Sequence, residues 1–261
     1  MQERLAVANK AAWETKAYQA WVRHYGTPNE LARKLKIDPR QPLRYWLKYL
    51  GAPSGKRVLN LLGSHGKKAI CLALMGAEVT VVDISEENRL YANEAAKSAG
   101  VHLNYICADA LKIPDEEALG KFDVVLMEFG ILHYFTDLRD VFALVNRRLE
   151  VNGRLMLTDF HPFARTWLKT TNLQYPSGIY FDDSIKEGDV AFAKLLPEEE
   201  RAGLNKVLTK SWTVGEIISS VASEGLFLRT FEEIRNAQEP LPEFYTLIAD
   251  KIDAQIPPLN P

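Results

Sequence analysis

The 261-residue sequence has few cysteines, no long apolar run and almost no net charge. Its two cysteines, Cys71 and Cys107, lie inside apolar stretches and outside any Cys/His cluster. This pattern is typical of small buried thiols in a reducing compartment, and it argues against a zinc site. No signal-peptide core and no stretch of membrane-spanning length is present, so we expect a cytoplasmic protein that does not enter a membrane.

Charge of one sign is also scarce overall, because the net charge is only −2. The distribution is nevertheless uneven. Residues 1–56 carry eleven Lys/Arg against four Asp/Glu, whereas residues 57–261 carry twenty-one against thirty. The basic segment either faces an anionic partner or is an ordinary solvated helical surface, and the sequence favours the second interpretation.

The glycine patterns of the common nucleotide loops are missing. The loop at residues 60–66, "NLLGSHG", carries only Gly63 and Gly66 and does not match the G-x-G-x-x-G of a dinucleotide loop. The stretch "GAPSGKR" (51–57) is one residue too short for a phosphate-binding P-loop, lacks the Ser/Thr and precedes a strand instead of following one.

A regular alternation of strands and helices is present from residue 57 onward. Apolar and β-branched runs predict strands at 57–62, 78–83, 102–108, 122–129 and 154–160, and helical spacing predicts helices at 66–77, 85–100 and 137–150. A helix at 213–225 and strands at 226–233 and 243–251 follow. The gap between the last two strands is too short for a helix, so they should pair as an antiparallel hairpin.

This pattern predicts an α/β fold: a doubly wound, mostly parallel, seven-stranded Rossmann-like sheet with a terminal antiparallel β-hairpin. Helices at 3–25, 27–35 and 42–51 form an N-terminal helical extension. We expect a helical cap at 1–55, an α/β domain at 56–251 with an insertion or lid at 161–210, and a tail at 252–261.

Ligands of an open parallel sheet bind beyond the carboxyl ends of its strands. Gly63 and Gly66 follow the first strand, and Asp83 ends the second, where an acid can bind the two hydroxyls of a ribose. The ligand is either a dinucleotide or an adenosine joined to something other than pyrophosphate.

Four segments occur in a characteristic order: "VTVVDIS", "CADAL", "FDVVLMEFGILHYFTDL" and "LEVNGRLMLTDFHP". With the final hairpin, residues 55–250 resemble the class I S-adenosylmethionine-dependent methyltransferase family. The resemblance implies S-adenosylmethionine as cofactor, with Asp83 on the ribose, Ile84, Ala108, Asp109 and Ala110 around the adenine, and Gly63, Ser64 and Gly66 along the methionine part. It also implies that Glu128, Phe129 and Gly130 face the methionine amine and the methyl group.

The chain departs from the family in the loop after the first strand. The family has an acid followed by x-G-x-G-x-G, whereas this sequence has Asn60, and Leu62 and Ser64 replace the first two glycines. Asn60 can accept a hydrogen bond from an ammonium, although without the strength that a charge adds. Lys67 and Lys68 begin the next helix, where the macrodipole disfavours cations. We therefore hypothesise that one of them, or Ser64, meets the methionine carboxylate, the alternative being that both lysines point into water.

Methyl transfer needs a base only where the acceptor loses a proton. His133 and His161 are the candidate catalytic residues; Glu128, Tyr134 and Asp159 are further candidates, and His65 is expected to be an exposed loop residue. Aromatic side chains are expected to form the acceptor pocket: Tyr18, Trp21, Tyr134 and Tyr180, with Tyr25, Tyr175 and Phe181 as further walls. Trp13 and Trp21 also fit an ordinary core stripe.

No motif identifies the methylated atom. The tetrapeptide of DNA-amine methyltransferases is absent after the fourth strand, where "EFGI" stands, so a small-molecule acceptor is favoured and the protein is expected to be a monomer or homodimer. The alternatives are, in order, a nucleic-acid methyltransferase whose residues 1–56 track phosphates, a non-catalytic binder of an adenosyl ligand, and a nicotinamide oxidoreductase.

Overall fold

The computed structural model describes residues 1–167, 179–235 and 241–253, and its centre is one seven-stranded sheet. The strand order is β3-β2-β1-β4-β5-β9-β8. The strands are β1 (Arg57–Leu61), β2 (Glu78–Asp83), β3 (Asn104–Cys107), β4 (Phe122–Glu128), β5 (Leu149–Phe160), β8 (Leu226–Arg235) and β9 (Pro242–Lys251). β1 to β5 pair in parallel, and β9 is antiparallel to both β5 and β8. The predicted doubly wound sheet and terminal hairpin are therefore confirmed.

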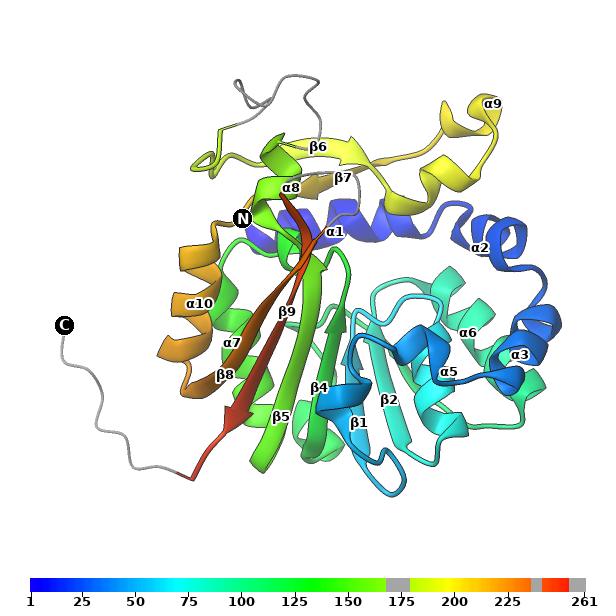
Figure 1. Cartoon of the computed structure of the whole chain (residues 1–261). Coiled ribbons are helices and arrows are strands. Elements are labelled where there is room, and N and C mark those ends of the chain that lie inside the picture. Colours follow the sequence, from blue (N-terminus) through cyan, green and yellow to red (C-terminus); the bar gives the residue numbers. More distant parts are fainter. Residues whose placement is uncertain (168–178, 236–240, 254–261) are drawn as a thin grey trace.

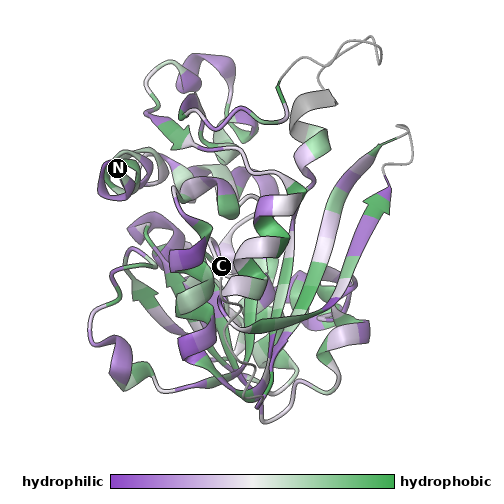
Figure 2. Cartoon of the chain, turned by 90° about the vertical axis from the view of Figure 1, so that its left-hand side faces the viewer, coloured by the Kyte–Doolittle hydropathy of each residue, from purple (hydrophilic) through white to green (hydrophobic). Residues whose placement is uncertain are grey.

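Helices cover both faces of this sheet (Figure 1). α3 (Pro28–Ile37), α5 (Lys67–Leu74) and α6 (Glu86–Ala99) belong to one core layer, and α7 (Leu138–Arg148) and α10 (Val214–Ser223) belong to the other. Strand residues alternate between the layers: Val58 packs into the first and Leu59 into the second. Figure 2 shows the resulting hydrophobic strands behind helices with hydrophilic turns. No helix in the described ranges is long and apolar enough to span a membrane.

Capping side chains fix several helix starts where the sequence places them. Thr27 and Thr213 form capping boxes for α3 and α10. Ser85 accepts the Asn88 N–H at the start of α6, and Gly100 ends that helix in the left-handed conformation.

The N-terminal segment differs from the prediction in two places. The single helix expected at 3–25 is wrong: α1 (Gln2–Trp13) and α2 (Ala17–Tyr25) are separated at Lys16, whose φ is 67°. The break lets the Tyr18 N–H donate to Glu87 on α6 (2.8 Å). The helix expected at 42–51 is a 3-10 turn η1 (Gln41–Leu43) and one turn of α4 (Leu47–Leu50), between which buried Trp46 donates to Thr158 Oγ1 (2.8 Å).

The segment after β5 lies with α1 and α2 over the carboxyl ends of the strands (Figure 1). It contains α8 (Pro162–Trp167), β6 (Lys186–Asp189), the 3-10 helix η4 (Ala191–Leu195), α9 (Glu198–Arg201) and β7 (Lys206–Thr209). β6 and β7 form an antiparallel pair. Asn9 of α1 joins β7 as an extra polar partner: its amide donates to the Leu208 carbonyl (3.0 Å) and accepts the Leu208 N–H (2.7 Å). The short 3-10 helices η2 (Glu116–Leu119) and η3 (Leu132–Tyr134) follow β3 and β4.

An ion cluster links the three strands at the sheet's antiparallel edge. Asp250 on β9 accepts from Arg154 on β5 (2.7 and 3.0 Å) and from Arg229 on β8 (2.9 Å). Burial alone would raise the pKa of Asp250, but the hydrogen bonds from the two arginines outweigh it and lower that pKa.

Candidate active site

A cavity of about 440 Å³ lies where the loops after β1, β2, β3 and β4 meet, with residues of α1, α2 and η4 on its other side. Parallel strands bring their carboxyl ends to one edge, so loops that are far apart in the sequence converge there. The residues predicted for the site that line this cavity are Trp21, Gly63, Ser64, Asp83, Ile84, Ala108, Asp109, Ala110, Glu128, Phe129, Gly130, His133 and Tyr134.

Asp83, at the end of β2, holds the loop after β1. Its carboxylate accepts the Ser64 N–H (3.0 Å), the Ser85 N–H (3.0 Å) and the Asn88 side-chain amide (3.1 Å). Burial raises the pKa of Asp83, and these hydrogen bonds oppose that effect. Asp83 takes part in none of the ion pairs between described residues, so no cation neutralises its charge at the cavity wall.

The loop after β1 keeps a glycine-like backbone without the glycines. Leu62 has a φ of 51° and Ser64 a φ of 50°, both in the left-handed region that L-residues rarely adopt. Tyr105 on β3 donates its hydroxyl to the Ser64 carbonyl (2.7 Å), and Asp83 accepts the Ser64 N–H. The surrounding structure thus enforces at Ser64 a conformation that glycine would adopt without strain.

Two predicted loop residues, Asn60 and Gly66, lie outside the cavity lining. Asn60 is fully buried and donates its amide to the Leu126 carbonyl (3.2 Å). A Cβ on Gly66 would lie 2.8 Å from Ala92 Cβ of α6. Gly66 therefore permits the close approach of α5 to α6, a packing requirement that a cofactor-loop pattern does not reveal.

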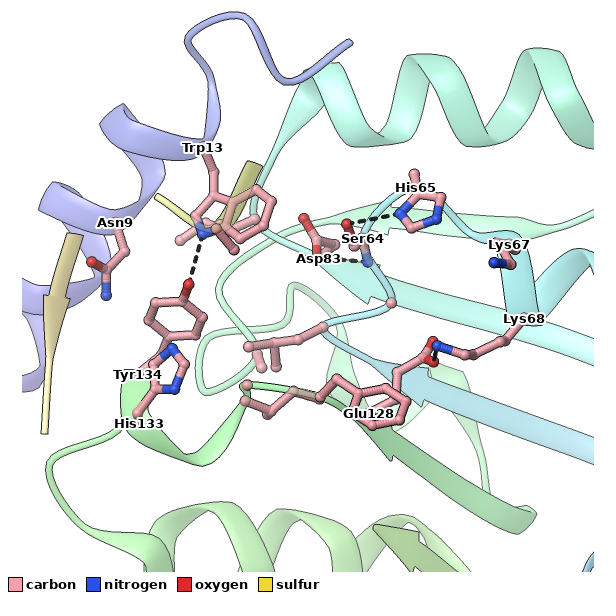
Figure 3. Close-up of a pocket in the computed structure, with 18 of the residues that line it drawn as sticks. Asn9, Trp13, Ser64, His65, Lys67, Lys68, Asp83, Glu128, His133 and Tyr134 are labelled. Carbon is pink, nitrogen blue, oxygen red and sulfur yellow. Dashed lines mark hydrogen bonds and ion pairs between the residues drawn. The ribbon is translucent and has the colours of Figure 1, made fainter. Parts of the chain in front are cut away.

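Lys67, Lys68 and Glu128 lie together at one end of the cavity, opposite Trp13 and Tyr134 (Figure 3). Lys68 Nζ forms an ion pair with Glu128 and lies 4.9 Å from the centroid of the Phe129 ring. The Lys68 and Glu128 side chains are 18% and 9% exposed, so this pair is largely shielded from water. Lys67 Nζ lies instead over the Tyr25 ring of α2, at 4.7 Å. Both lysines therefore face the protein. The alternative considered from the sequence, that both point into water, does not hold.

Asp159, considered above as a base, has a different environment. Its side chain is 4% exposed and lies outside the cavity lining. Its Oδ1 accepts the N–H groups of Gly130 (2.6 Å) and Phe160 (2.7 Å), and its Oδ2 accepts those of Ile131 and Leu132 (both 3.1 Å). Asp159 therefore fixes the loop after β4, as Asp83 fixes the loop after β1.

Aromatic rings from α2 pack against the loop after β1. The His65 ring lies 4.4 Å from the Trp21 ring and 4.7 Å from the Tyr25 ring, centroid to centroid. The expectation of an exposed His65 is wrong, because these rings cover it. Burial and, to a smaller extent, Lys68 lower the pKa of His65 well below its usual value, so this imidazole is neutral at physiological pH.

Helix α1 contributes residues that sequence reasoning did not assign to the site: Gln2, Asn9 and Trp13 line the cavity. Trp13 Nε1 donates to the Tyr134 hydroxyl (3.2 Å), and the Gln2 amide donates to the Tyr134 carbonyl (3.2 Å). The aromatic stripe of Trp13 and Trp21 was the available signal, but the same spacing also fits a core helix. Lys194 of η4 also lines the cavity and had no signal in the sequence.

His161, predicted as catalytic, does not line the cavity. It is fully buried; its Nδ1 accepts the Phe163 N–H (3.2 Å), and its Nε2 lies 3.0 Å from Glu233 Oε1. Burial lowers its pKa, while Glu233 acts in the opposite direction. The antiparallel hairpin supplies Glu233, from β8, and this contact was not visible in the sequence.

Two predicted acceptor-wall residues also lie outside the cavity lining. The Tyr18 hydroxyl donates to Glu94 (2.6 Å), and the Tyr180 hydroxyl accepts the Val214 N–H (2.9 Å). Tyr25 does line the cavity, Phe181 is 80% exposed, and Tyr175 lies outside the described residues.

Residues 61–157 match the family model described as "Methyltransferase domain". A demethylmenaquinone methyltransferase from Thermus thermophilus is 32% identical over 109 residues, 41% of this chain and 48% of that protein. A ubiquinone biosynthesis O-methyltransferase from Ralstonia nicotianae is 25% identical over 199 residues, 75% and 79% of the two chains. The chain spans about half the length of the first curated relatives it matches.

Solved structures share the fold at low sequence identity. An S-adenosylmethionine-dependent methyltransferase from Mesorhizobium loti has a TM-score of 0.60 at 20% identity, covering 81% of this chain and 97% of its own. The magnesium protoporphyrin IX methyltransferase from Synechocystis, solved with bound S-adenosylhomocysteine (SAH), has a TM-score of 0.60 at 17% identity, covering 94% of this chain and 99% of its own.

The strand order, the converging loops and the matched domain agree with one another. Residues 61–157 carry a methyltransferase domain, and the chain has the fold of S-adenosylmethionine-dependent methyltransferases.

Proposed function

We propose that this protein transfers a methyl group from S-adenosylmethionine to a small-molecule acceptor. The observation that carries the proposal is the meeting of Asp83, Asp109 and Glu128, each from a different strand end, in one cavity. The cavity volume falls within the range of roughly 300–1,000 Å³ that is usual for small-ligand sites. The names of curated relatives, which include quinone-biosynthesis methyltransferases, support a small acceptor.

The residues present fit the cofactor at both of its ends. Asp83 offers an unneutralised carboxylate for the ribose hydroxyls, and Ile84, Ala108 and Ala110 offer apolar surface for the adenine. At the other end, Lys68 and Glu128 present opposite charges side by side. That arrangement is complementary to the amino-acid part of the cofactor, which carries a carboxylate and an ammonium. In this chain the pair takes over the charge recognition that the family assigns to an acid at the position of Asn60.

The chemistry of the bound cofactor is an electrophilic methyl group on a sulfonium; the chain supplies alignment and exclusion of water. α1, α2 and η4 wall the cavity opposite the strand ends, which favours a small acceptor over a polymer. We propose His133 as the residue that receives the acceptor's proton where one is lost, because it lines the cavity and His161 does not. We also propose residues 1–55 as a cap on the 56–251 domain, with 161–210 as its second part.

Turnover with a panel of small phenols, amines and carboxylic acids tests the function, with S-adenosylhomocysteine (SAH) formation as the readout. We expect at least one acceptor to raise the rate of SAH formation above the acceptor-free rate. Asp83→Asn should remove that increase, and the exposed control Asp140→Asn should keep it. Tight S-adenosylmethionine binding with no acceptor-dependent SAH from any class would instead favour a non-catalytic binder.

The amino-acid end can be tested without turnover by comparing SAH with 5′-methylthioadenosine, which lacks the amino-acid group. Lys68→Met and Glu128→Gln should each weaken SAH binding about tenfold or more, the scale of one lost charge-assisted contact. Both variants should bind methylthioadenosine as the wild type does. An equal loss for both ligands in titration calorimetry would contradict the assignment.

A further inference from the structure

Positive charge gathers in the cavity beyond what the Lys68–Glu128 pair neutralises. The cations Lys67 and Lys194 also line it, from α5 and η4, and His24 of α2 adds an imidazole that can donate a hydrogen bond. Among the ion pairs of the described residues, none includes Lys67 or Lys194, and the one acid at this end, Glu128, is paired with Lys68.

Lys67 is in an unfavourable place for an unpaired cation. It is the first residue of α5, where the positive end of the macrodipole repels a cation. Its side chain is half-buried over the Tyr25 ring, and burial followed by the neighbouring Lys68 lowers its pKa. A cation held in such a position is stabilised by an anion that enters the cavity.

The two lysines face different parts of the cavity wall. Lys68 points to Glu128 and the Phe129 ring at the strand ends, where the cofactor's amino-acid part is proposed (Figure 3). Lys67 lies against α2, with its Nζ over the Tyr25 ring. Burial lowers the pKa of His24, and the charges of Lys67 and Lys194 lower it further. Lys67, His24 and Lys194 therefore form a basic group on the side of the cavity that α2 and η4 cover.

We propose that the methyl acceptor carries an anionic group, a carboxylate or a phosphate, and that Lys67 binds this group with support from Lys194 and His24. The proposal rests on the proposed function and names the acceptor class. The Tyr25 ring lies beside Lys67 and stacks on the Trp21 ring, and both rings line the cavity, so the rest of the acceptor near the anion is an aromatic or other flat apolar body.

Titration calorimetry on the protein saturated with SAH tests this assignment with two anionic probes, benzoate and phenyl phosphate, and with benzamide as the uncharged analogue of benzoate. We expect at least one anion to bind more tightly than benzamide. Lys67→Met should weaken that anion about tenfold or more, and Lys67→Arg, which keeps the charge, should restore most of the affinity. Lys48→Met is the matched control, because Lys48 is exposed and pairs with Glu232. This substitution should leave the affinity for the anion unchanged.

The same titrations separate the two sources of an anion. If Lys67→Met weakens SAH tenfold and leaves the probes unchanged, Lys67 binds the cofactor's carboxylate and the proposal is overturned. If neither anion binds wild type more tightly than benzamide, the cavity does not select an anionic acceptor, and the proposal is equally overturned. If SAH itself does not bind, the proposed function fails, and the anion titrations of the free protein still show whether Lys67 forms an anion site.

Discussion

Replacing Asp159 by asparagine tests how the loop after β4 is built. The change keeps the shape of the side chain but leaves one oxygen where two accept four N–H groups. If the remaining oxygen keeps Gly130 and Phe160, then the Ile131 and Leu132 N–H groups face an amide NH₂. Two charge-assisted bonds of roughly 1.5–3 kcal/mol each are lost. Part of this loss is offset because the buried charge disappears as well, so we expect a net cost of about 3 kcal/mol.

Thermal unfolding followed by circular dichroism measures this cost. For a chain of this size, about 3 kcal/mol corresponds to a fall in melting temperature of roughly 6–12 °C. The exposed Asp140→Asn is the control, with an expected change within about 0.5 kcal/mol. A loss below about 1 kcal/mol for Asp159→Asn would refute the claim that this carboxylate holds the loop.

Three further predictions follow from the geometry, at Gly66, Ser64 and Asp250, and chemical denaturation measures each of them. Gly66→Ala should lower the free energy of unfolding by about 2 kcal/mol or more, because the new Cβ would overlap Ala92 and the backbone has a φ of +70°. Gly100→Ala, which has a φ of +78° but open space around it, is the control and should cost only about 1 kcal/mol. Equal costs would argue against the contact between α5 and α6. Ser64→Gly should have a free energy of unfolding within about 1 kcal/mol of wild type, and Ser64→Val one about 2 kcal/mol lower, because only valine adds strain at this left-handed backbone. The reverse order of stability would contradict a left-handed conformation that the surrounding structure enforces. Asp250→Asn should lower the free energy of unfolding by about 1–2 kcal/mol at pH 7. Because the folded state lowers the pKa of Asp250, the carboxylate stabilises the fold above its unfolded pKa of 3.8 and ceases to do so as the pH falls through the folded pKa. A stability difference between wild type and variant that does not shrink below pH 4 would be inconsistent with this pairing.

The fold was predictable because local signals and the global topology agree. Apolar runs of strand length alternate with capped helices, and such an alternation allows few arrangements other than a parallel sheet with helices on both faces. The break at Lys16 was not predictable, because the helical spacing of residues 3–25 is continuous. Contacts with α6, which are distant in the sequence, decide that the chain turns there.

Residues of the candidate site were predictable where their place at a strand end brings them to the cavity. Asp83, Asp109 and Glu128 reach the cavity because the topology brings their strand ends to one edge. The roles of Gly66 and His161 depend instead on a helix contact and on a hairpin, which spacing along the chain does not encode. The lining residues of α1 were missed for the same reason, since the direction in which α1 crosses the strands is a tertiary property.

Titration calorimetry of SAH into wild type and Asp83→Asn tests the central claim most directly, because Asp83 is the acid that the account places on the ribose. We predict one SAH per chain for wild type and a loss of about tenfold to a hundredfold for Asp83→Asn, with circular dichroism confirming that the variant remains folded. NAD should not bind. Absence of SAH binding to wild type, or binding of NAD in its place, would contradict the account.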